Sequence, residues 1–320
     1  MNNRNQAGVP ADGRAAQSLR NDSSMRKWTR KVLKHRQYYY LLVPGLLYFL
    51  IFKYIPMLGV SMAFQDFKIT GGMFGSPWAG LKWFHILFDN DDFWIAFRNT
   101  LIISVYKLVF YFPAPIIAAM LINEVFSSKI KRTIQTIIYF PHFTSWVIIS
   151  GVMVTILSPS TGLVSLFHMS SSPLMQPEYF RSLLVASEIW KEMGWGTVIY
   201  FAAISGINPE QYEAATIDGA NRLRMAWNIT LPSIANTIVI MFILRTGHIL
   251  SVGFDQVYNL YNPLVYNVGD ILDTYVYRTG LTSGRFSLAT AAGLFQSAVG
   301  LVLLLICNWT AKRLGREGIW

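Results

Sequence analysis

Charged side chains inside otherwise apolar stretches are the residues of this chain best placed to do chemistry. An ionisable group within a membrane-spanning segment costs about 2.5 to 3.5 kcal/mol to insert, so it usually faces a partner group or a water-filled path. The groups of this kind are Lys107, Glu188, Lys191, Arg245 and His248. Glu188, Lys191 and Trp195 share one helical face, and Arg245 and His248 are three residues apart. The spacing predicts polar helix faces that line a path across the membrane. The five charged groups are expected at mid-depth or in the outer half of the membrane.

A packing role is the alternative for the same residues. Glu188 would then pair with Lys191, and the other charged groups would bond to backbone carbonyls. The last apolar stretch carries a further polar face, formed by Gly293, Gln296, Ser297 and Gly300. This face favours close helix contact, with exposure of Gln296 to the path as the alternative. The aromatic residues near the predicted span ends read as interfacial anchors without a substrate role, namely Trp78, Trp83, Trp94 and Tyr111.

The sequence lacks the motifs of several kinds of functional site. No stretch has the Gly-Lys-Ser/Thr ending of a phosphate-binding loop, so the sequence predicts that this chain does not bind or hydrolyse ATP. The five histidines lack the spacing of metal ligands, and no catalytic triad or carboxylate pair is recognisable. The single cysteine, Cys307, excludes an intrachain disulfide and a cysteine metal cluster. We therefore predict no enzyme activity, no cofactor and no metal in this chain.

Apolar residues, 53% of the 320, fall in blocks, and the mean hydropathy is +0.36. This composition is typical of an all-α integral membrane protein. Six blocks approach or exceed the roughly 20 residues that cross a bilayer, namely Leu41–Val60, Phe97–Ile122, Ile134–Leu157, Leu183–Gly206, Ser233–Gly253 and Phe286–Trp309. Lys53 and Pro56 interrupt the first block, and the residues after Pro56 are expected along the outer interface.

Basic residues give the predicted orientation. Most of the 27 lysines and arginines lie before the first block, between the second and third, between the fourth and fifth, and after the sixth. The positive-inside rule makes those segments cytoplasmic, with both termini inside. We expect a basic, disordered tail over residues 1–37, a six-helix domain over 38–310 and a cytoplasmic tail over 311–320. The net charge of +10 thus reflects basic residues that set the orientation in the membrane and face lipid headgroups. No nucleic-acid partner is predicted.

A polar helix-turn-helix is predicted over residues 208–232, between two spans. Asn208 can cap a helix that begins at Pro209. Asp218 and Gly219 end this helix because glycine tolerates the left-handed conformation, and a second helix follows over Ala220–Thr230. Pro232 disfavours helical geometry at Leu231, so the chain should bend there.

This segment resembles the EAA loop of importer-type ABC transporter permeases. The matching residues are Glu213, Ala214, Ala215, Asp218, Gly219, Ala220, Trp227, Ile229, Leu231 and Pro232, with Trp227 in place of the usual Phe. The resemblance implies that Glu213 meets an ATPase arginine, that Ala214 and Ala215 allow close docking, and that Gly219 permits the turn. An ordinary capped cytoplasmic hairpin is the alternative.

A wider resemblance covers Tyr38 to the C-terminus. The segments Tyr39–Phe67, Gly80–Phe88, Phe112–Glu124 and Phe254–Tyr266 resemble oligosaccharide permeases of the MalF/MalG-like superfamily, particularly its LplB-type subgroup. This subgroup includes permeases for acidic oligosaccharides such as alginate and aldouronates, so the resemblance suggests an acidic oligosaccharide such as alginate as the substrate.

The resemblance implies a type I (MetI-like) fold with six transmembrane helices in the bacterial inner membrane. It also implies a second, different six-helix permease, an extracytoplasmic binding protein that delivers the substrate, and two cytoplasmic ATPases that bind ATP and Mg. ATP closes the ATPase dimer, and the EAA loops move with it.

An oligosaccharide would suit the predicted path, because polar groups meet its hydroxyls and aromatic rings meet its ring faces. Uronates add carboxylates, which arginine and lysine recognise. Three alternatives stay open: the same machinery carrying a non-sugar solute, an ATP-independent secondary carrier, and a membrane-anchored assembly protein. The carrier would leave the hairpin of residues 208–232 without a role.

Overall fold

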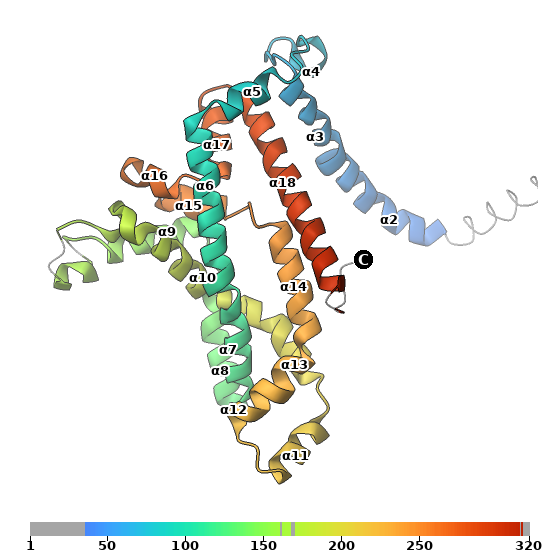
Figure 1. Ribbon diagram of the computed structural model, residues 1–320, viewed down its shortest axis with the longest axis vertical. Helices are drawn as coiled ribbons and strands as arrows, with labels where there is room; N and C mark the ends of the chain where they lie inside the picture. The colour runs from blue at the N-terminus through green and yellow to red at the C-terminus, as the bar shows by residue number, and fades with distance from the viewer. Residues whose placement is uncertain (1–35, 161, 168–169, 314, 316–320) are drawn as a thin grey trace, which may run out of the picture. The chain divides into compact units, whose positions relative to one another are not determined.

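The computed structural model describes residues 36–160, 162–167, 170–313 and 315, which are almost entirely helical (Figure 1). Among these residues, strand pairing is limited to one isolated bridge between Gln65 and Trp78. The chain divides into a unit over residues 1–59 and a unit over residues 60–320. The predicted tail over residues 1–37 lies almost wholly outside the described residues.

The first apolar block forms one helical stretch, Arg36–Phe64, of 29 residues. It consists of α2 (Arg36–Phe49), η1 (Leu50–Tyr54), α3 (Ile55–Met57) and η2 (Leu58–Phe64). The predicted interruption at Lys53 and Pro56 is therefore wrong. A wide π turn, in which Ile55 N–H bonds to the carbonyl of Leu50, takes up the proline.

A π turn also precedes two other prolines. The π turns η3 (Lys107–Tyr111) and η7 (Ala226–Thr230) each end two residues before a proline, Pro113 and Pro232. Proline lacks an N–H, and its ring collides with the carbonyl four residues earlier, so a turn closed by i to i+5 bonds lets the helix continue. As a result α6 (Asp91–Tyr106), η3 and α7 (Pro113–Asn123) form one 33-residue helix.

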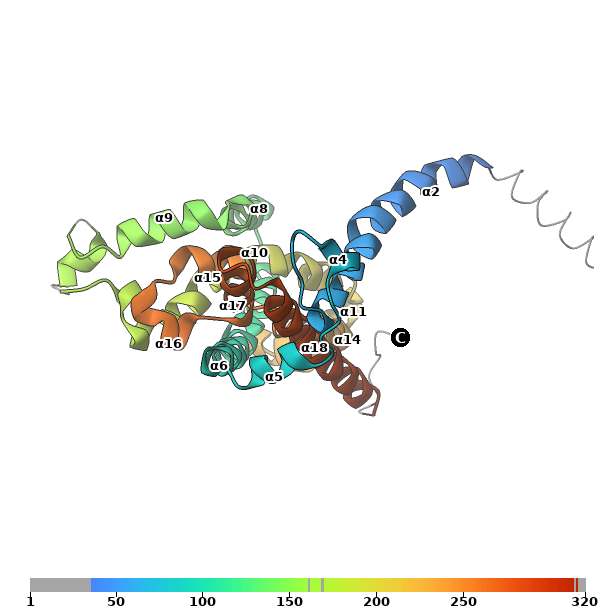
Figure 2. The same cartoon turned by 90° about the horizontal axis from the view of Figure 1, so that it is seen from above.

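The third block is broken rather than continuous. It comprises α8 (Ser128–Tyr139), the short η4 (Phe140–Phe143) and α9 (Trp146–Ile156), with a bend of 100° between the two parts. In Figure 2, α8 is seen end-on while α9 runs sideways. The block Ile134–Leu157, predicted as one span, is thus a bent pair of helices rather than one straight helix. The bend arises because Pro141 lies in η4 and disfavours a continuous α-helix, and because Ser145 caps α9 by accepting from Ile148 N–H.

The second half of the chain begins with α10 (Pro177–Ser205) and two short helices, α11 (Pro209–Ile217) and α12 (Arg222–Met225). After η7, α13 (Leu231–Ser233) and α14 (Ala235–Gly247) meet at a 62° bend. The bend lies at Ile234, not at Leu231 as predicted, because the π turn keeps the chain helical through Pro232.

The remaining elements are short except for the last. The short ones are α4 (Gly72–Gly75), α5 (Lys82–Phe88), η5 (Leu163–Phe167), η6 (Pro173–Met175), α15 (Phe254–Leu260), η8 (Pro263–Val265), α16 (Tyr266–Gly269), α17 (Leu272–Tyr277) and η9 (Arg278–Thr282). The last is α18 (Phe286–Arg313), which packs against α14 and α17 (Figure 1). In Figure 1, α11 lies at the lower end of the second unit, and α4 and α5 lie at its upper end.

Three helical stretches of the described residues are long and apolar enough to cross a membrane, Arg36–Phe64, Asp91–Asn123 and Phe286–Arg313, and up to five if each bent pair is one span. The 29-residue α10 is not among them, since Glu188, Lys191 and Glu192 lie within it. Apolar side chains are nonetheless widely exposed, as on Val105, Val109, Phe110, Val147, Ile148, Leu301, Val302, Leu305 and Ile306. Such surfaces need a bilayer or another apolar partner.

Close helix contacts occur where glycine removes a side chain. A Cβ at Gly194 in α10 would overlap the backbone of Ile138 in α8, and one at Gly247 in α14 would overlap Leu304 in α18. A Cβ at Gly300 would lie 3.5 Å from the carbonyl of Gly247. Gly300 of the predicted small-residue face thus packs against α14, whereas Gly293 of the same face has open space around it.

Gly194→Ala is expected to lower the free energy of unfolding by about 1–3 kcal/mol, because the added methyl must displace backbone rather than a flexible side chain. Denaturant titration of the purified protein in detergent measures this loss. Gly293→Ala is the matched control, since a Cβ there meets nothing within 4 Å and alanine favours the helix by about 0.5–1 kcal/mol. Equal stability of the two variants would contradict the close packing of α10 on α8.

Candidate functional site

A non-helical segment, residues 248–253, separates α14 from α15 and leaves backbone carbonyls without helical partners. Side chains of other helices satisfy three of them. Ser104 bonds to the carbonyl of Ile249, Gln296 donates to Leu250 O at 2.9 Å, and Lys107 donates to Val252 O at 2.5 Å. Irregular backbone at membrane depth survives only where such partners exist. Two predicted path residues, Lys107 and Gln296, are therefore engaged in holding this segment.

Lys107, Glu188 and Arg245 form an ion-paired triad across three helices, in which Lys107 and Glu188 are buried and Arg245 is partly exposed. The Lys107 ammonium pairs with one carboxylate oxygen of Glu188, and Arg245 Nη2 lies 2.8 Å from the other. Lys107 also donates to Gln256 Oε1 at 2.7 Å, and Gln256 in turn donates to Ser187 Oγ at 2.8 Å. The triad thus joins η3, α10 and α14 to the start of α15.

A second charged cluster lies one turn further along α10. Lys191 pairs with Glu192 at 2.9 Å and donates to the backbone carbonyl of His142 at 2.7 Å. His142 Nδ1 lies 2.6 Å from Glu192, and the His142 ring stacks on Trp195 with centroids 4.7 Å apart. The alternative pairing of Glu188 with Lys191 is therefore wrong, because each finds its partner elsewhere.

A cavity of about 240 Å³ lies beside both clusters. Its lining consists of Tyr111, Trp146, Glu188, Glu192, Arg245, Ser251, Val252, Gly253 and Gln256. Lys107, Lys191 and Arg245 supply three cations here, against the two carboxylates of Glu188 and Glu192. The lysine and arginine side chains around the cavity therefore outnumber its carboxylates by one. Its aromatic rings and hydrogen-bonding groups suit a polar ligand with apolar faces.

The predicted path residues differ in their relation to this cavity. Glu188 and Arg245 line it, and Lys107 and Lys191 pair with its lining carboxylates. Trp195, His248 and Gln296 are not part of its lining. Trp195 stacks on His142, which contacts the lining residue Glu192.

The sequence missed several lining residues. Tyr111 is one of them, since it lies under the Arg245 guanidinium at 5.1 Å from the ring centroid, rather than serving only as an interfacial anchor. Tyr111 follows Lys107 by four residues, and Glu192 follows Glu188 by four. This i, i+4 spacing was the signal that could have placed both on the polar faces.

The segment of residues 208–232 folds as two short helices around a glycine. Asn208 accepts from Glu210 N–H at 3.1 Å, Asn221 accepts from Arg224 N–H at 2.8 Å, and Gly219 has a φ of +75°. The predicted cap at Asn208, helix start at Pro209 and turn at Gly219 are confirmed. The second helix starts at Arg222 rather than Ala220, and its cap, Asn221, was not predicted. The Tyr212 and Thr230 hydroxyls, 2.9 Å apart, close the hairpin.

The outer surface of this hairpin is open. Glu213, Ala214, Asp218, Gly219 and Pro232 are exposed, and Ala215, Ala220 and Leu231 are half-buried. Large apolar side chains also protrude from it, those of Ile217, Leu223 and Trp227. An exposed apolar group of this size on a polar hairpin is typical of a protein contact.

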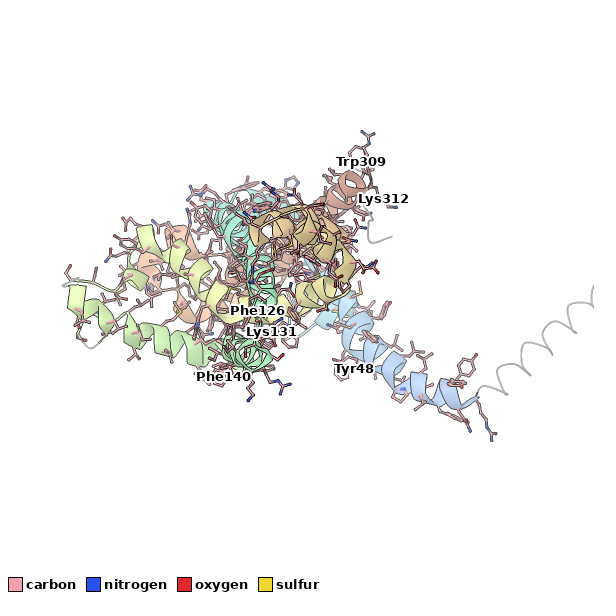
Figure 3. The ribbon with its side chains drawn as sticks, turned by 90° about the horizontal axis from the view of Figure 1, so that it is seen from below. Tyr48, Phe126, Lys131, Phe140, Trp309 and Lys312 are labelled. Atoms are coloured by element: carbon pink, nitrogen blue, oxygen red, sulfur yellow. The ribbon has the colours of Figure 1, made fainter. Side chains whose placement is uncertain are left out.

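The hairpin is attached to the connection between α7 and α8 through Arg222. Its guanidinium lies 4.3 Å from the Phe126 ring centroid and 3.5 Å from the Glu124 carboxylate. Figure 3, a view from below, labels Phe126 and also Lys131, which lies in the first half of α8. Because α8 leads to His142, this contact links the hairpin to the helix that ends at the second charged cluster.

A model of the family "binding-protein-dependent transport system inner membrane component" matches residues 111–316. The chain is 46% identical to "Protein LplB" of Bacillus subtilis over 298 residues, 92% of this chain and 94% of that protein. It is 44% identical to the polygalacturonan/rhamnogalacturonan transport system permease protein YteP of B. subtilis, over 91% of this chain and 92% of the other.

Solved structures agree with these relatives. A chain in the crystal structure of a bacterial alginate ABC transporter, in complex with an alginate pentasaccharide-bound periplasmic protein, is 42% identical. The likeness has a TM-score of 0.83 and covers 91% of this chain and 99% of the other.

Proposed function

The chain belongs to the family of binding-protein-dependent transport system inner membrane components, and on that premise we propose that it forms half of the membrane pathway of an ATP-driven importer for acidic oligosaccharides. The observation that carries the substrate class is the cavity beside α10, with its aromatic rings and its excess positive charge. Uronate carboxylates complement that charge, and sugar ring faces suit Tyr111 and Trp146. Relatives that handle polygalacturonan and alginate support the same class.

A second six-span permease would complete the pathway. This chain would contribute residues that line it or support its lining, namely Lys107, Glu188, Lys191, Trp195, Arg245, His248 and Gln296. The broken third block and the 62° bend at Ile234 would each belong to one of six spans, with α10 as the fourth. The exposed apolar side chains of α6, α9 and α18 would face lipid or the second permease.

The hairpin of residues 208–232 would couple this pathway to ATP hydrolysis in two partner ATPases, which hold the ATP and Mg. Its basic neighbours would place it in the cytoplasm together with both termini. Glu213, Ala214, Ala215, Asp218, Gly219 and Ala220 would dock in the ATPase surface, with Leu231 and Pro232 continuing into the next span. A periplasmic or cell-surface binding protein would supply substrate from the other side.

Gentle purification of this chain from its native membrane, followed by counting of what remains bound, tests the assembly. We expect a second six-span permease and two ATPase copies per complex. Reconstituted vesicles with the binding protein outside and ATP inside should then take up oligogalacturonate or oligoalginate. A stable complex without an ATPase, or flux that continues without ATP, would instead support a self-sufficient carrier.

A further inference from the structure

We propose that Arg245 is the residue of this chain that binds a substrate carboxylate, and that Lys107 and Glu188 position it without contacting substrate. This proposal deepens the proposed function and rests on it, since it names the group that selects acidic over neutral oligosaccharides. The three residues belong to one ion-paired triad, so charge alone does not separate their roles. The exposed fractions of the three side chains and their other hydrogen bonds distinguish these roles.

All hydrogen-bond donors of the Lys107 ammonium are used within the protein. Its side chain is 2% exposed, and its ammonium bonds to Glu188, Val252 O and Gln256 Oε1. An ammonium has three donors, and these three partners use all of them. Lys107 therefore holds the non-helical segment and the carboxylate of Glu188, and has no donor left for a ligand.

Arg245 has N–H donors that are free to bind a ligand. Its side chain is 33% exposed, it lines the cavity, and a single Nη2 donor bonds to Glu188 at 2.8 Å. A guanidinium carries five N–H donors in a planar fork that matches a carboxylate in two-point contact. Tyr111 lies beneath its plane at 5.1 Å and keeps it at the cavity wall.

Glu188 lets Arg245 exchange one carboxylate for another. When a substrate carboxylate draws the guanidinium into the cavity, the charge of Glu188 remains paired with Lys107. Neither member of the resting pair is then left buried and unpaired, which is the costly outcome for such groups. The incoming carboxylate also offsets the excess positive charge of the two clusters. A neutral sugar offers no such compensation.

Binding of two matched ligands to the purified permease–ATPase complex, without the binding protein, tests the proposal. Tetragalacturonate carries four carboxylates, and its methyl ester keeps the same sugars without the charge. We expect the wild type to bind the acid roughly 10- to 100-fold more tightly than the ester. Arg245→Gln should bring that ratio close to one while ester binding stays the same, and Arg245→Lys should keep part of the preference.

Lys82→Gln is the charge-matched control, because Lys82 pairs with Asp66 at an exposed site and its loss should leave the ratio unchanged. An Arg245→Gln complex that keeps the wild-type ratio would overturn the role of Arg245. A wild type that binds acid and ester equally would instead contradict the acidic substrate itself, so the two failures are distinguishable. A fall in the affinity for both ligands together would assign Arg245 a purely structural role and would also overturn the proposal.

Discussion

Glu188→Gln is expected to lower the free energy of unfolding by about 3–5 kcal/mol, the usual cost of removing one partner from a buried ion pair. Glutamine has nearly the size of glutamate, so steric effects contribute little. The loss arises because Lys107, 2% exposed, keeps its charge with only Val252 O and Gln256 as partners. Denaturant titration of the detergent-purified protein, followed by circular dichroism, measures the change.

Asp66→Asn provides the surface comparison for this prediction. Asp66 and Lys82 also pair at 2.9 Å, but their side chains are 35% and 51% exposed, so we expect a change within about 1 kcal/mol. A Lys107→Met, Glu188→Met double variant should recover much of the loss, because the unpaired buried charge is gone and Arg245 can reach the cavity. If Glu188→Gln were no worse than Asp66→Asn, the triad would not stabilise the fold.

Local signals made the hairpin of residues 208–232 readable from sequence. A helix cap, a first-turn proline and a glycine at positive φ each act within a few residues of the chain, as Asn208, Pro209 and Gly219 do here. The sequence also located three of the apolar blocks, which form the long helical stretches Arg36–Phe64, Asp91–Asn123 and Phe286–Arg313, because hydropathy is a sum over neighbouring residues. The prolines misled it, since a π turn before Pro56 or Pro232 keeps the helix intact at a point where proline usually ends one.

The break at residues 248–253 could not be read in the same way. Apolar residues occupy half of it, and the groups that satisfy its carbonyls are Ser104, Lys107 and Gln296, which lie on distant helices. The partner of Glu188 was missed for the same reason. Lys191 is the near candidate along the chain, whereas Lys107 and Arg245 become neighbours only once three helices have packed.

Two features of the hairpin would let it transmit motion to the rest of the protein. Its two short helices are closed by the Tyr212–Thr230 bond, so the pair can move as one piece. Arg222 attaches it to Phe126 and Glu124, next to the start of α8. A force on its exposed side would therefore act on α8, which leads to His142 in the second charged cluster, and on α14, which carries Arg245 in its last turn.

Leu223→Asp is expected to remove the ATPases from the purified complex while leaving the permease folded. Leu223 is 68% exposed at the hairpin surface, so aspartate costs the isolated chain little, whereas burying a charge in an apolar contact weakens association roughly 30-fold or more. Recovery of ATPase with tagged permease, together with the melting temperature of the permease, measures both. Leu264→Asp is the matched control at 65% exposure in η8, away from the hairpin, and should retain the ATPases. Normal ATPase recovery with Leu223→Asp would mean that the apolar side of the hairpin is not the docking surface.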